Sequence, residues 1–393
     1  MTILRRSLEA LLLTMASIGL TLALFEIALR ALPIGPAGAP DPETGPIGQL
    51  YTRSESPELG FEHARDVHVR FPPHPVGDRM TSAWEVGIDA NGLRRNGRGD
   101  PLAAELRGIC LGDSTMFGVG LNDGETIPAQ LGAIVSERLG RSFECLNFGV
   151  SNYTTAQEVA LFRHLDALRF DPSIVVLGIY TNDFKASIGR IDVREGETRL
   201  ISPDAPAALD RSLASLRVVR LAVAGTLAFR DQLRRIGLYP QANAKPLRPE
   251  EIAAVYGALD ELRALLEPRR IPLVLLLFPR DWQLGARDRE AASERQRASL
   301  AYCRRHGLRC VDLLDHFWGR PIDDYFRPGD DSHPHAQAAR ISAELLADPV
   351  VDALTKGPSQ GARAPDQYGR RFSISSGTST SSRAMRSPER PSP

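Results

Sequence analysis

The sequence predicts an α/β protein in which a parallel sheet is covered by helices on both faces. From residue 106 onward, short apolar runs alternate with stretches of helical length and composition. This alternation is typical of a parallel sheet, because each strand needs a crossover before the next one. Right-handed crossovers bring the carboxyl ends of the strands to one edge, where active sites collect. The predicted strands are 109–111, 145–148, 174–180, 273–278 and 309–313, and the predicted helices are 127–139, 155–169, 250–266, 290–306 and 336–346.

The bulk composition excludes some classes of function. The chain has 393 residues, of which 42% are hydrophobic and 24% charged, as in ordinary globular proteins. Its 48 Lys and Arg residues balance 48 Asp and Glu residues, so nothing in the net charge favours nucleic acid as a partner. The sequence contains no Cys-x-x-Cys motif and no His/Cys cluster. We therefore expect no structural zinc site and no cofactor.

Residues 1–33 are predicted to form an N-terminal signal anchor, a single transmembrane helix. Residues 10–25 are uncharged and mostly apolar, and the helix reaches across a hydrocarbon core of roughly 30 Å only if it extends to Leu32. Glu26 and Arg30 are spaced to pair near the far interface. Arg5 and Arg6 should keep the N-terminus in the cytoplasm and place the rest of the chain outside it, in the periplasm of a Gram-negative cell.

Two other interpretations of the N-terminal segment stay open. A cleaved signal peptide is one, since Ala37-Gly38-Ala39 resembles a cleavage site, although it lies far beyond the apolar run. A buried amphipathic helix is the other, although residues 10–25 lack a polar face.

The predicted catalytic domain spans residues 106–354, with flanking segments of different composition. Residues 34–105 read as a Pro/Gly-rich linker followed by a small β appendage, which contains the turn signal Asn91-Gly92. Residues 355–393 are rich in Ser, Gly, Pro, Arg and Thr and predict a disordered tail. Residues 184–245 form an insertion with a polar first part and a basic helical pattern over 208–236. That helix is a lid, a membrane-surface helix or a core-packed helix with a solvated basic face.

The four cysteines fall into two pairs. Cys110 and Cys145 lie in apolar strand-like runs, where we expect them to be unpaired core residues. Cys303 and Cys310 flank a helix end and the next strand, and they can form a disulfide if the compartment is oxidising.

Ser114 is the candidate nucleophile. It follows the strand-like run 109–111 and a Gly112-Asp113 turn, which places its hydroxyl at the carboxyl end of a strand. A serine hydroxyl needs a base to take its proton and a carboxylate to orient that base. A serine that only caps a helix is the alternative.

Gly149 and Asn182 are candidate donors to a developing oxyanion. Gly149 ends a predicted strand and can present its N–H to a ligand, while Asn182 follows the next strand and can donate from its amide. Each is also consistent with an ordinary loop residue.

The candidate base and its orienting acid lie in the segment 328–335. Asp330 precedes His333 by three residues, so the carboxylate can hold the imidazole within one local turn. Asp331 and His335 are close enough to compete for these roles, and all four residues together resemble a weak metal-ligand set.

These pieces, in this order, resemble the SGNH (GDSL) hydrolase superfamily. The four matching blocks are 111–118, 147–151, 181–183 and 330–333. The resemblance implies a flavodoxin-like three-layer α/β/α fold with a five-stranded parallel sheet. It also implies Ser114 as nucleophile, His333 as base and Asp330 as the orienting acid. The implied oxyanion hole comprises the Ser114 N–H, the Gly149 N–H and the Asn182 amide.

Tyr180 is a departure from the family pattern, which usually has Gly two residues before the Asn of the third block. A larger side chain there is expected to narrow the pocket or alter access for the acyl acceptor. We therefore expect the departure to affect the class of substrate more than the catalytic steps.

The resemblance implies a hydrolase that cleaves acyl esters, with acetyl as the expected group, through an acyl-enzyme intermediate. The expected substrate is a small-molecule or glycan ester. One alternative is an O-acetyltransferase or deacetylase that tailors a cell-surface polysaccharide. The other is a non-catalytic binding component that retains the fold.

Overall fold

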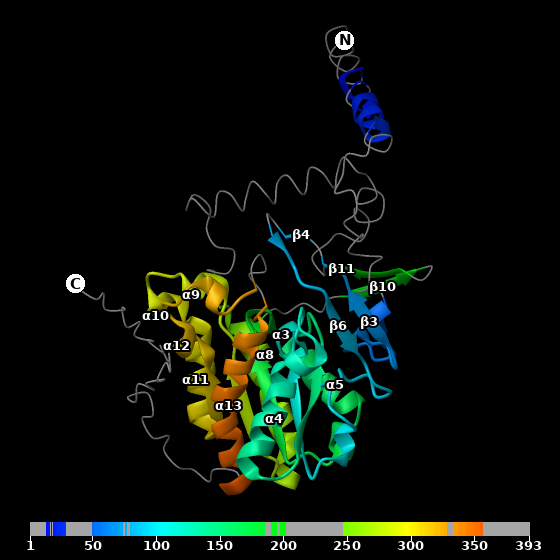
Figure 1. Cartoon of the computed structure of the whole chain (residues 1–393). Coiled ribbons are helices and arrows are strands. Elements are labelled where there is room, and N and C mark those ends of the chain that lie inside the picture. Colours follow the sequence, from blue (N-terminus) through cyan, green and yellow to red (C-terminus); the bar gives the residue numbers. More distant parts are fainter. Residues whose placement is uncertain are drawn as a thin grey trace, which may run out of the picture.

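The computed structural model describes residues 13–15, 17, 19–28, 49–73, 75–76, 79–184, 190–194, 197–201, 247–327 and 333–356. Its centre is a parallel five-stranded sheet in the order β13-β12-β9-β7-β8 (Figure 1). The strands are β7 (Leu106–Gly112), β8 (Phe143–Gly149), β9 (Ile174–Ile179), β12 (Leu273–Leu277) and β13 (Arg309–Asp312). This is the flavodoxin-like order, and the strand order reverses between β7 and β9. All five predicted strands are confirmed.

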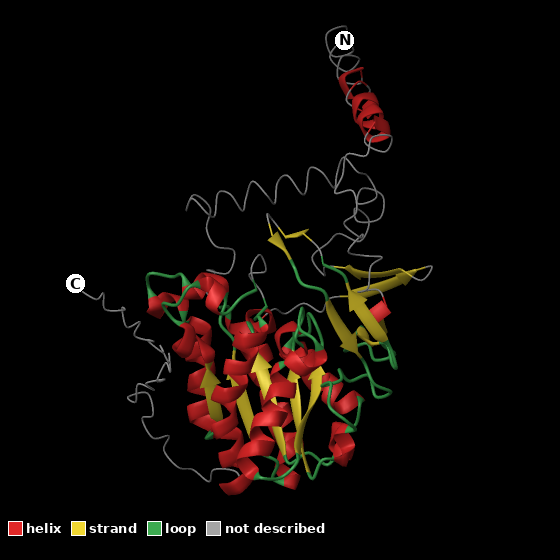
Figure 2. Ribbon diagram, in the orientation of Figure 1, coloured by secondary structure: helices red, strands yellow, loops and turns green. Residues whose placement is uncertain are grey.

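Helices cover both faces of the sheet, as predicted (Figure 2). One face packs against α5 (Thr155–His164), α8 (Pro249–Leu266) and α11 (Glu294–His306). The other face packs against α4 (Ile127–Leu139), α12 (Leu313–Phe317) and α13 (Ala336–Lys356). The three-layer α/β/α architecture of the sequence prediction is therefore confirmed.

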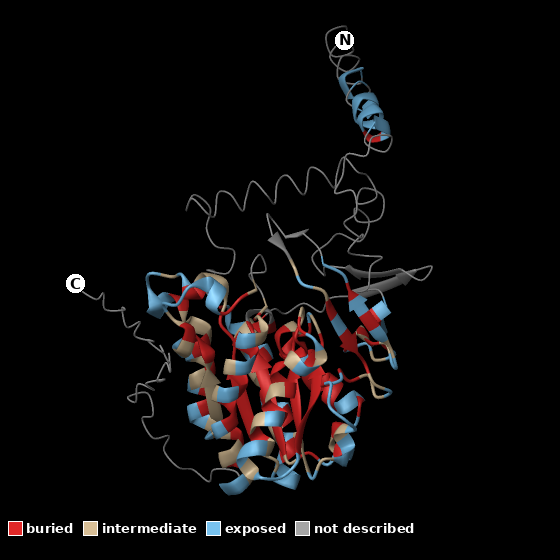
Figure 3. Ribbon diagram, in the orientation of Figure 1, coloured by how far each residue is buried: buried red, intermediate tan, exposed pale blue. Residues whose placement is uncertain are grey.

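The strand side chains alternate between two cores. In β12, Leu273, Leu275 and Leu277 face the α5, α8 and α11 side, while Val274 and Leu276 face the opposite side. The sheet is buried throughout its centre (Figure 3). A parallel sheet covered on both faces explains why its strands are continuous apolar runs in the sequence.

Short strands ahead of the sheet form the predicted β appendage. They are β1 (Tyr51–Arg53) with β2 (Phe61–His63), β3 (His68–Phe71) with β6 (Trp84–Gly87), and β4 (Pro75–Val76) with β5 (Arg79–Met80). Buried side chains of the appendage, including Phe61 and Trp84, join the same core as α5. The appendage therefore shares a hydrophobic core with the sheet.

The remaining elements are short. A hairpin of β10 (Arg190–Arg194) and β11 (Glu197–Ile201) lies in the insertion, where the sequence predicted only a polar stretch. The helical pattern over 208–236 lies outside the described residues. The predicted tail 355–393 also lies outside them from residue 357 onward, while Thr355 and Lys356 belong to α13, so the prediction placed the start of the tail too early. The short helices are α3 (Ser114–Phe117), α9 (Asp281–Leu284) and α10 (Arg289–Ala292), with 3₁₀ turns at Pro101–Ala103, Asp123–Glu125, Ala167–Phe170, Thr181–Phe184, Glu267–Arg269 and Ile322–Asp324.

The N-terminal segment is described only in part. Residues 13–15, 17 and 19–28 are helical, whereas residues 1–12, 16, 18 and 29–33 lie outside the described part. Within the ranges that the structure describes, no helix is long and apolar enough to cross a membrane. The predicted anchor therefore stays a prediction.

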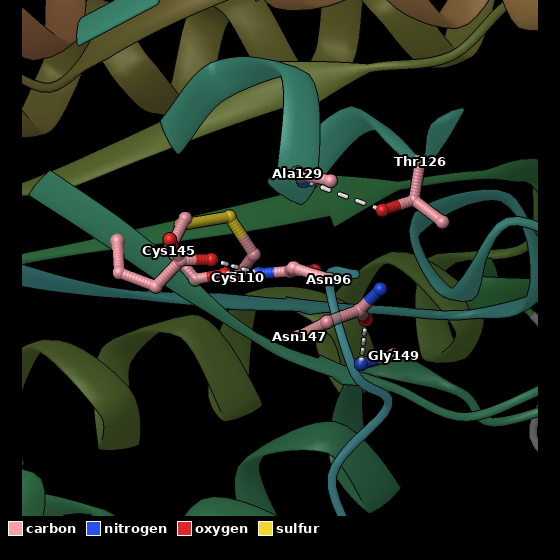
Figure 4. The surroundings of a disulfide bond; sticks show 8 residues. Asn96, Cys110, Thr126, Ala129, Cys145, Asn147 and Gly149 are labelled. Atoms are coloured by element: carbon pink, nitrogen blue, oxygen red, sulfur yellow. Dashed lines mark hydrogen bonds between the residues drawn. A yellow bond between two sulfur atoms is a disulfide. The ribbon is translucent and has the colours of Figure 1, made fainter. Parts of the chain in front are cut away.

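The cysteines are paired differently from the sequence expectation. Cys110 and Cys145 form a disulfide between neighbouring strands β7 and β8, with Cα atoms 6.0 Å apart (Figure 4). The prediction of two unpaired core cysteines was wrong, because strand order places the two side chains on the same face of adjacent strands. Cys303 and Cys310 also form a disulfide, which ties the end of α11 to β13.

Candidate active site

A tight turn at the carboxyl end of β7 presents Ser114. A Cβ on Gly112 would lie 2.5 Å from Cβ of Met116, so the turn requires glycine at this position. The Asp113 side chain caps α3, since its Oδ1 accepts the Thr115 N–H at 2.9 Å. Ser114 is the first residue of α3 and is half-buried. Its N–H has no acceptor within the helix, and its hydroxyl stands at the sheet edge.

The hydroxyl of Ser114 lies at hydrogen-bond distance from the imidazole of His333. Ser114 Oγ and His333 Nε2 lie 2.9 Å apart, although 219 positions separate the two residues in the chain. The segment around His333 is tied back to the core, because the Arg327 N–H donates to the His333 carbonyl at 3.1 Å. A bridge between Phe326 and Pro334 adds to this attachment. The structure thus joins the predicted nucleophile and the predicted base at hydrogen-bond distance.

The side chain of His335 makes a different contact from that of His333. Its Nδ1 accepts the Ala338 N–H at 3.1 Å, which caps the first turn of α13. The backbone N–H of His335 donates to the Tyr325 carbonyl at 3.0 Å. The His335 ring is therefore engaged at the helix start, whereas the His333 ring contacts Ser114, and the role of His333 as the base stays a prediction.

The acidic residues of the same segment lie outside the described part of the chain. These are Asp330 and Asp331, within the gap 328–332. The orienting role of Asp330 therefore stays a prediction. Among the residues that the structure does describe, no group of three or more His, Cys, Asp or Glu side chains is placed to hold a metal ion.

Gly149 ends β8 beside Gly112, but its N–H already has a partner. It donates to the Asn147 side-chain oxygen at 3.0 Å (Figure 4). A Cβ at Gly149 would collide with the backbone of Phe117, so the absent side chain serves the close packing of α3 against β8. The absence of a side chain at Gly149 is therefore required for packing, and the donor role of its N–H stays a prediction.

The loop after β8 contains a feature that sequence analysis missed. Asn152 takes the left-handed conformation, with φ of 66°. The turn around it is closed by the Tyr153 N–H, which donates to the Val150 carbonyl at 3.2 Å. The only local signal in the sequence is the tolerance of Asn for this conformation.

Asn182 lies in the 3₁₀ turn Thr181–Phe184, directly beyond β9 and next to the β7 end. Its backbone is at the predicted edge of the sheet, while its side chain lies outside the described atoms. Asp183 fixes the start of this turn, because its Oδ2 accepts the Tyr180 N–H at 2.6 Å. The donor role of the Asn182 amide stays a prediction.

Tyr180 points into the core of the protein. It is 6% exposed, its ring packs edge-on against Phe278, and its hydroxyl accepts a hydrogen bond from Arg280. Burial raises the pKa of Tyr180, so the hydroxyl is neutral at physiological pH. Since the ring packs away into the core, we find no support for the expected narrowing of the pocket by this side chain.

Two buried polar groups near the site were not singled out from the sequence. Arg94 donates to the carbonyls at the end of α3, and Glu158 lies buried in α5 beneath the turns that carry Ser114 and Asn182. Neither carries a motif; Arg94 follows the Asn91-Gly92 turn and Glu158 occupies a core-facing position of an ordinary helix.

A Ser–His pair at the carboxyl edge of a doubly wound parallel sheet is the arrangement of a serine hydrolase. The model of the GDSL-like lipase/acylhydrolase family matches residues 110–341, which is more than half of the chain. The chain belongs to this family and is a hydrolase that acts on ester bonds. No curated protein matches it in sequence.

Solved structures of several esterases and lipases are similar to the chain. A GDSL-like lipase from Bacteroides thetaiotaomicron shares 15% identity, with 64% of this chain and 88% of that one covered and a TM-score of 0.33. A psychrotrophic esterase from Pseudoalteromonas sp. shares 12% identity, with 64% and 99% covered and a TM-score of 0.36. An acetylxylan esterase from Geobacillus stearothermophilus shares 11% identity, with 67% and 100% covered and a TM-score of 0.37.

Proposed function

We propose that the protein cleaves acyl esters through a covalent acyl-enzyme formed on Ser114. The observation that carries the proposal is the 2.9 Å distance between Ser114 Oγ and His333 Nε2. A nucleophile and a base at this distance can transfer a proton as the nucleophile attacks. Acetyl is the acyl group that we propose, and a series of aryl esters of increasing chain length tests that choice.

In the first half of the reaction, Ser114 Oγ attacks the ester carbonyl carbon while His333 Nε2 takes the hydroxyl proton. The tetrahedral intermediate then breaks its bond to the alcohol, which leaves with the proton from His333. In the second half, water gives a proton to His333 and attacks the acyl-Ser114 carbonyl. Ser114 recovers its proton as the carboxylic acid departs.

The growing negative charge needs donors that are already aimed at it. We propose the Ser114 N–H and the Asn182 amide as two of them. The Gly149 N–H is engaged by Asn147. We propose the Gly149 N–H as the third donor, which an oxyanion would take over from the Asn147 side-chain oxygen. Asp330 is proposed to orient the His333 imidazole.

A fluorophosphonate probe tests this proposal, because it forms a stable adduct only with an activated serine. We expect one adduct, on the peptide that contains Ser114, and we expect His333→Ala to abolish it, since the base is then missing. The measurement is mass spectrometry of the labelled full-length protein after digestion.

The matched control is His335→Asn, which keeps a capping oxygen at the start of α13 and leaves the Ser114–His333 pair untouched. This variant should label like the wild type. Labelling at another serine, or undiminished labelling of His333→Ala, would contradict the proposed site.

We also propose that the catalytic domain works outside the cytoplasm, attached to a membrane by the N-terminal helix. Seven large apolar side chains of that helix are 48–72% exposed, namely Leu13, Met15, Leu20, Leu22, Leu24, Phe25 and Ile27. Disulfides such as Cys110–Cys145 persist mainly in oxidising compartments, which is consistent with this location.

A membrane-impermeant fluorophosphonate should therefore label Ser114 in cells whose cytoplasmic membrane is intact. The full-length protein should sediment with membranes and be released by detergent but not by high salt. Labelling that appears only after lysis, or release by salt alone, would reject this location and mode of attachment.

A further inference from the structure

The backbone of His333 is held by the stretch of chain at residues 325–327. Residues 333–335 run antiparallel to this stretch, and the Arg327 N–H donates to the His333 carbonyl at 3.1 Å. Both aromatic residues of the stretch are buried in the core that the sheet shares with α4 and α13. The position of His333 is therefore tied to that of Arg327.

The loop that follows the nucleophile helix is fixed to Ser114 itself. The N–H groups of Gly118 and Val119 both donate to the Ser114 carbonyl, at 2.9 and 3.1 Å. The Leu121 N–H donates to the Gly118 carbonyl at 3.1 Å and closes a turn around Gly120. Gly120 has a left-handed backbone, with φ of 77°. Because these hydrogen bonds restrict the turn, the position of Gly120 follows that of Ser114.

The guanidinium of Arg327 lies directly on Gly120. A Cβ at Gly120 would overlap Nη1 and Cζ of Arg327 and would lie 2.7 Å from Nε, all three being guanidinium atoms. Arg327 Nε is buried, so this end of the side chain is packed into the protein. Only a residue without a side chain allows such a close approach to the backbone.

These contacts form a closed path between the candidate nucleophile and the candidate base. The path runs from the Ser114 carbonyl through the turn to Gly120, where it meets the Arg327 side chain. It continues from the Arg327 N–H to the His333 carbonyl. It closes where His333 Nε2 lies 2.9 Å from Ser114 Oγ. A displacement at the contact between Gly120 and Arg327 therefore changes how Ser114 and His333 face each other.

We propose that Arg327 is a positioning residue, which aligns His333 with Ser114 by packing its guanidinium on Gly120. The inference rests on the proposed function of the Ser114–His333 pair. A guanidinium suits this role because it is planar and rigid, so its flat face can lie on a backbone surface, unlike the compact ammonium of Lys. Proton transfer from nucleophile to base requires the two groups to stay within hydrogen-bond reach.

The decisive test adds one methyl group at Gly120. Gly120→Ala pushes the guanidinium off the turn and so removes the same contact as Arg327→Ala. We expect each variant to lower kcat for a small aryl acetate by about tenfold or more, with KM within about twofold of the wild type. In the Arg327→Ala background, Gly120→Ala should lower kcat by no more than about a further threefold, because the contact is already gone. Equal losses in the two backgrounds would overturn the proposal.

Gly319→Ala is the matched control for backbone strain. Gly319 has nearly the same left-handed φ, 73°, but a Cβ there would have no described atom within 4 Å. Ala in this conformation destabilises the fold at either position. The unfolding midpoint should therefore fall in both variants, while kcat measured below the unfolding transition should fall only in Gly120→Ala. A matching loss of kcat in Gly319→Ala would attribute the effect to instability and reject the positioning role.

Arg327→Lys separates packing from charge. This variant keeps the positive charge but lacks the planar group, so we expect kcat to fall nearly as far as in Arg327→Ala, with KM again within about twofold of the wild type. If Arg327→Lys instead kept the wild-type kcat while Arg327→Ala raised KM, the charge of Arg327 would serve substrate binding and the positioning role would be rejected.

The rate of fluorophosphonate labelling at Ser114 separates this inference from the proposed function. An unlabelled wild type would reject the proposed function. A labelled wild type with an equal labelling rate in Gly120→Ala would reject the positioning role alone.

Urea unfolding of the wild type, the two single variants and the double variant needs no turnover. Gly120→Ala should lower the unfolding midpoint less when Arg327 is already Ala, since no guanidinium is then displaced. Strictly additive effects on the midpoint would show that the Arg327 side chain does not pack on Gly120 and would overturn the inference.

Discussion

Replacing Ser114 with Ala should lower kcat for a small aryl acetate by on the order of 10⁴- to 10⁶-fold, the range that loss of a catalytic nucleophile or its base causes in serine hydrolases. The hydroxyl oxygen of Ser114 lies 2.9 Å from His333 Nε2. Residual turnover would come from the oxyanion donors and from substrate binding. Steady-state kinetics, with active-site titration of the wild type, measures the effect.

The fold should survive this substitution. The cap of α3 uses the Asp113 side chain and the Thr115 N–H, and Ala preserves both. The unfolding midpoint should therefore change little, since the hydroxyl is half-buried. Ser142→Ala is the matched control, because Ser142 precedes β8 at the opposite edge of the sheet and its hydroxyl accepts only a local Glu105 N–H. Full activity in Ser114→Ala would rule out the acyl-enzyme mechanism.

The central sheet was predictable because a parallel sheet buried on both faces leaves a continuous apolar run in each strand. Helix α4 was predicted with its observed bounds, since Thr126, Pro128 and Gly140 mark its start and its end. The hairpin 190–201 and the five-residue helix α12 were missed. Such short elements depend on neighbouring parts of the fold and leave no periodic signal.

The cysteine pairing shows a second limit of local patterns. Each of Cys110 and Cys145 sits in an apolar run, which is equally consistent with a free core thiol and with a disulfide. Only the adjacency and register of β7 and β8 bring the two side chains together. The order of the strands in the sheet therefore determines this cysteine pairing, and a single sequence does not reveal that order.

The sequence predicted those site residues that directly follow the end of a strand. It predicted less well how a residue acts when that depends on a hydrogen bond to a neighbour. Ser114 and His333 were named from ordered motifs, and the structure brings them into contact. Gly149 was also at a strand end, but the Asn147 side chain takes its N–H. Glu158 carries no motif, and only the fold shows that this carboxyl is fully buried in α5.

Replacing Arg94 with Met should destabilise the fold by about 3–5 kcal/mol, the usual cost of removing one partner from a buried charged group. Arg94 is 2% exposed and comes from the β appendage. Its Nη1 donates to the Phe117 and Gly118 carbonyls at 2.6 Å each, and its Nη2 donates to the Leu121 carbonyl. Burial lowers the pKa of Arg94 to about 10 while Asp123 opposes this, so the side chain is charged at neutral pH.

The three carbonyls that Arg94 engages lie at and beyond the carboxyl end of α3, the helix that starts at Ser114. Without the guanidinium, these carbonyls and Asp123 each lose a charged donor, although Asp123 keeps the Gly87 N–H and the Phe117 carbonyl keeps the Asn147 amide. The carboxyl end of the short helix is then held less firmly. Because small misplacements of catalytic groups are costly, kcat should fall by about 10- to 100-fold in protein that is still folded. Thermal unfolding and kinetics below the unfolding transition measure the two effects separately.

The neighbouring Arg95 provides a matched control for Arg94. Its side chain is 56% exposed, and within the described region it forms a long ion pair of 3.9 Å with Asp66. Arg95→Met should therefore change the stability by no more than about 0.5 kcal/mol and leave kcat unaltered. If the two substitutions had equal effects, the β appendage would stabilise the protein only through its overall charge or packing. A selective loss in Arg94→Met would instead establish that the β appendage holds the nucleophile helix in place.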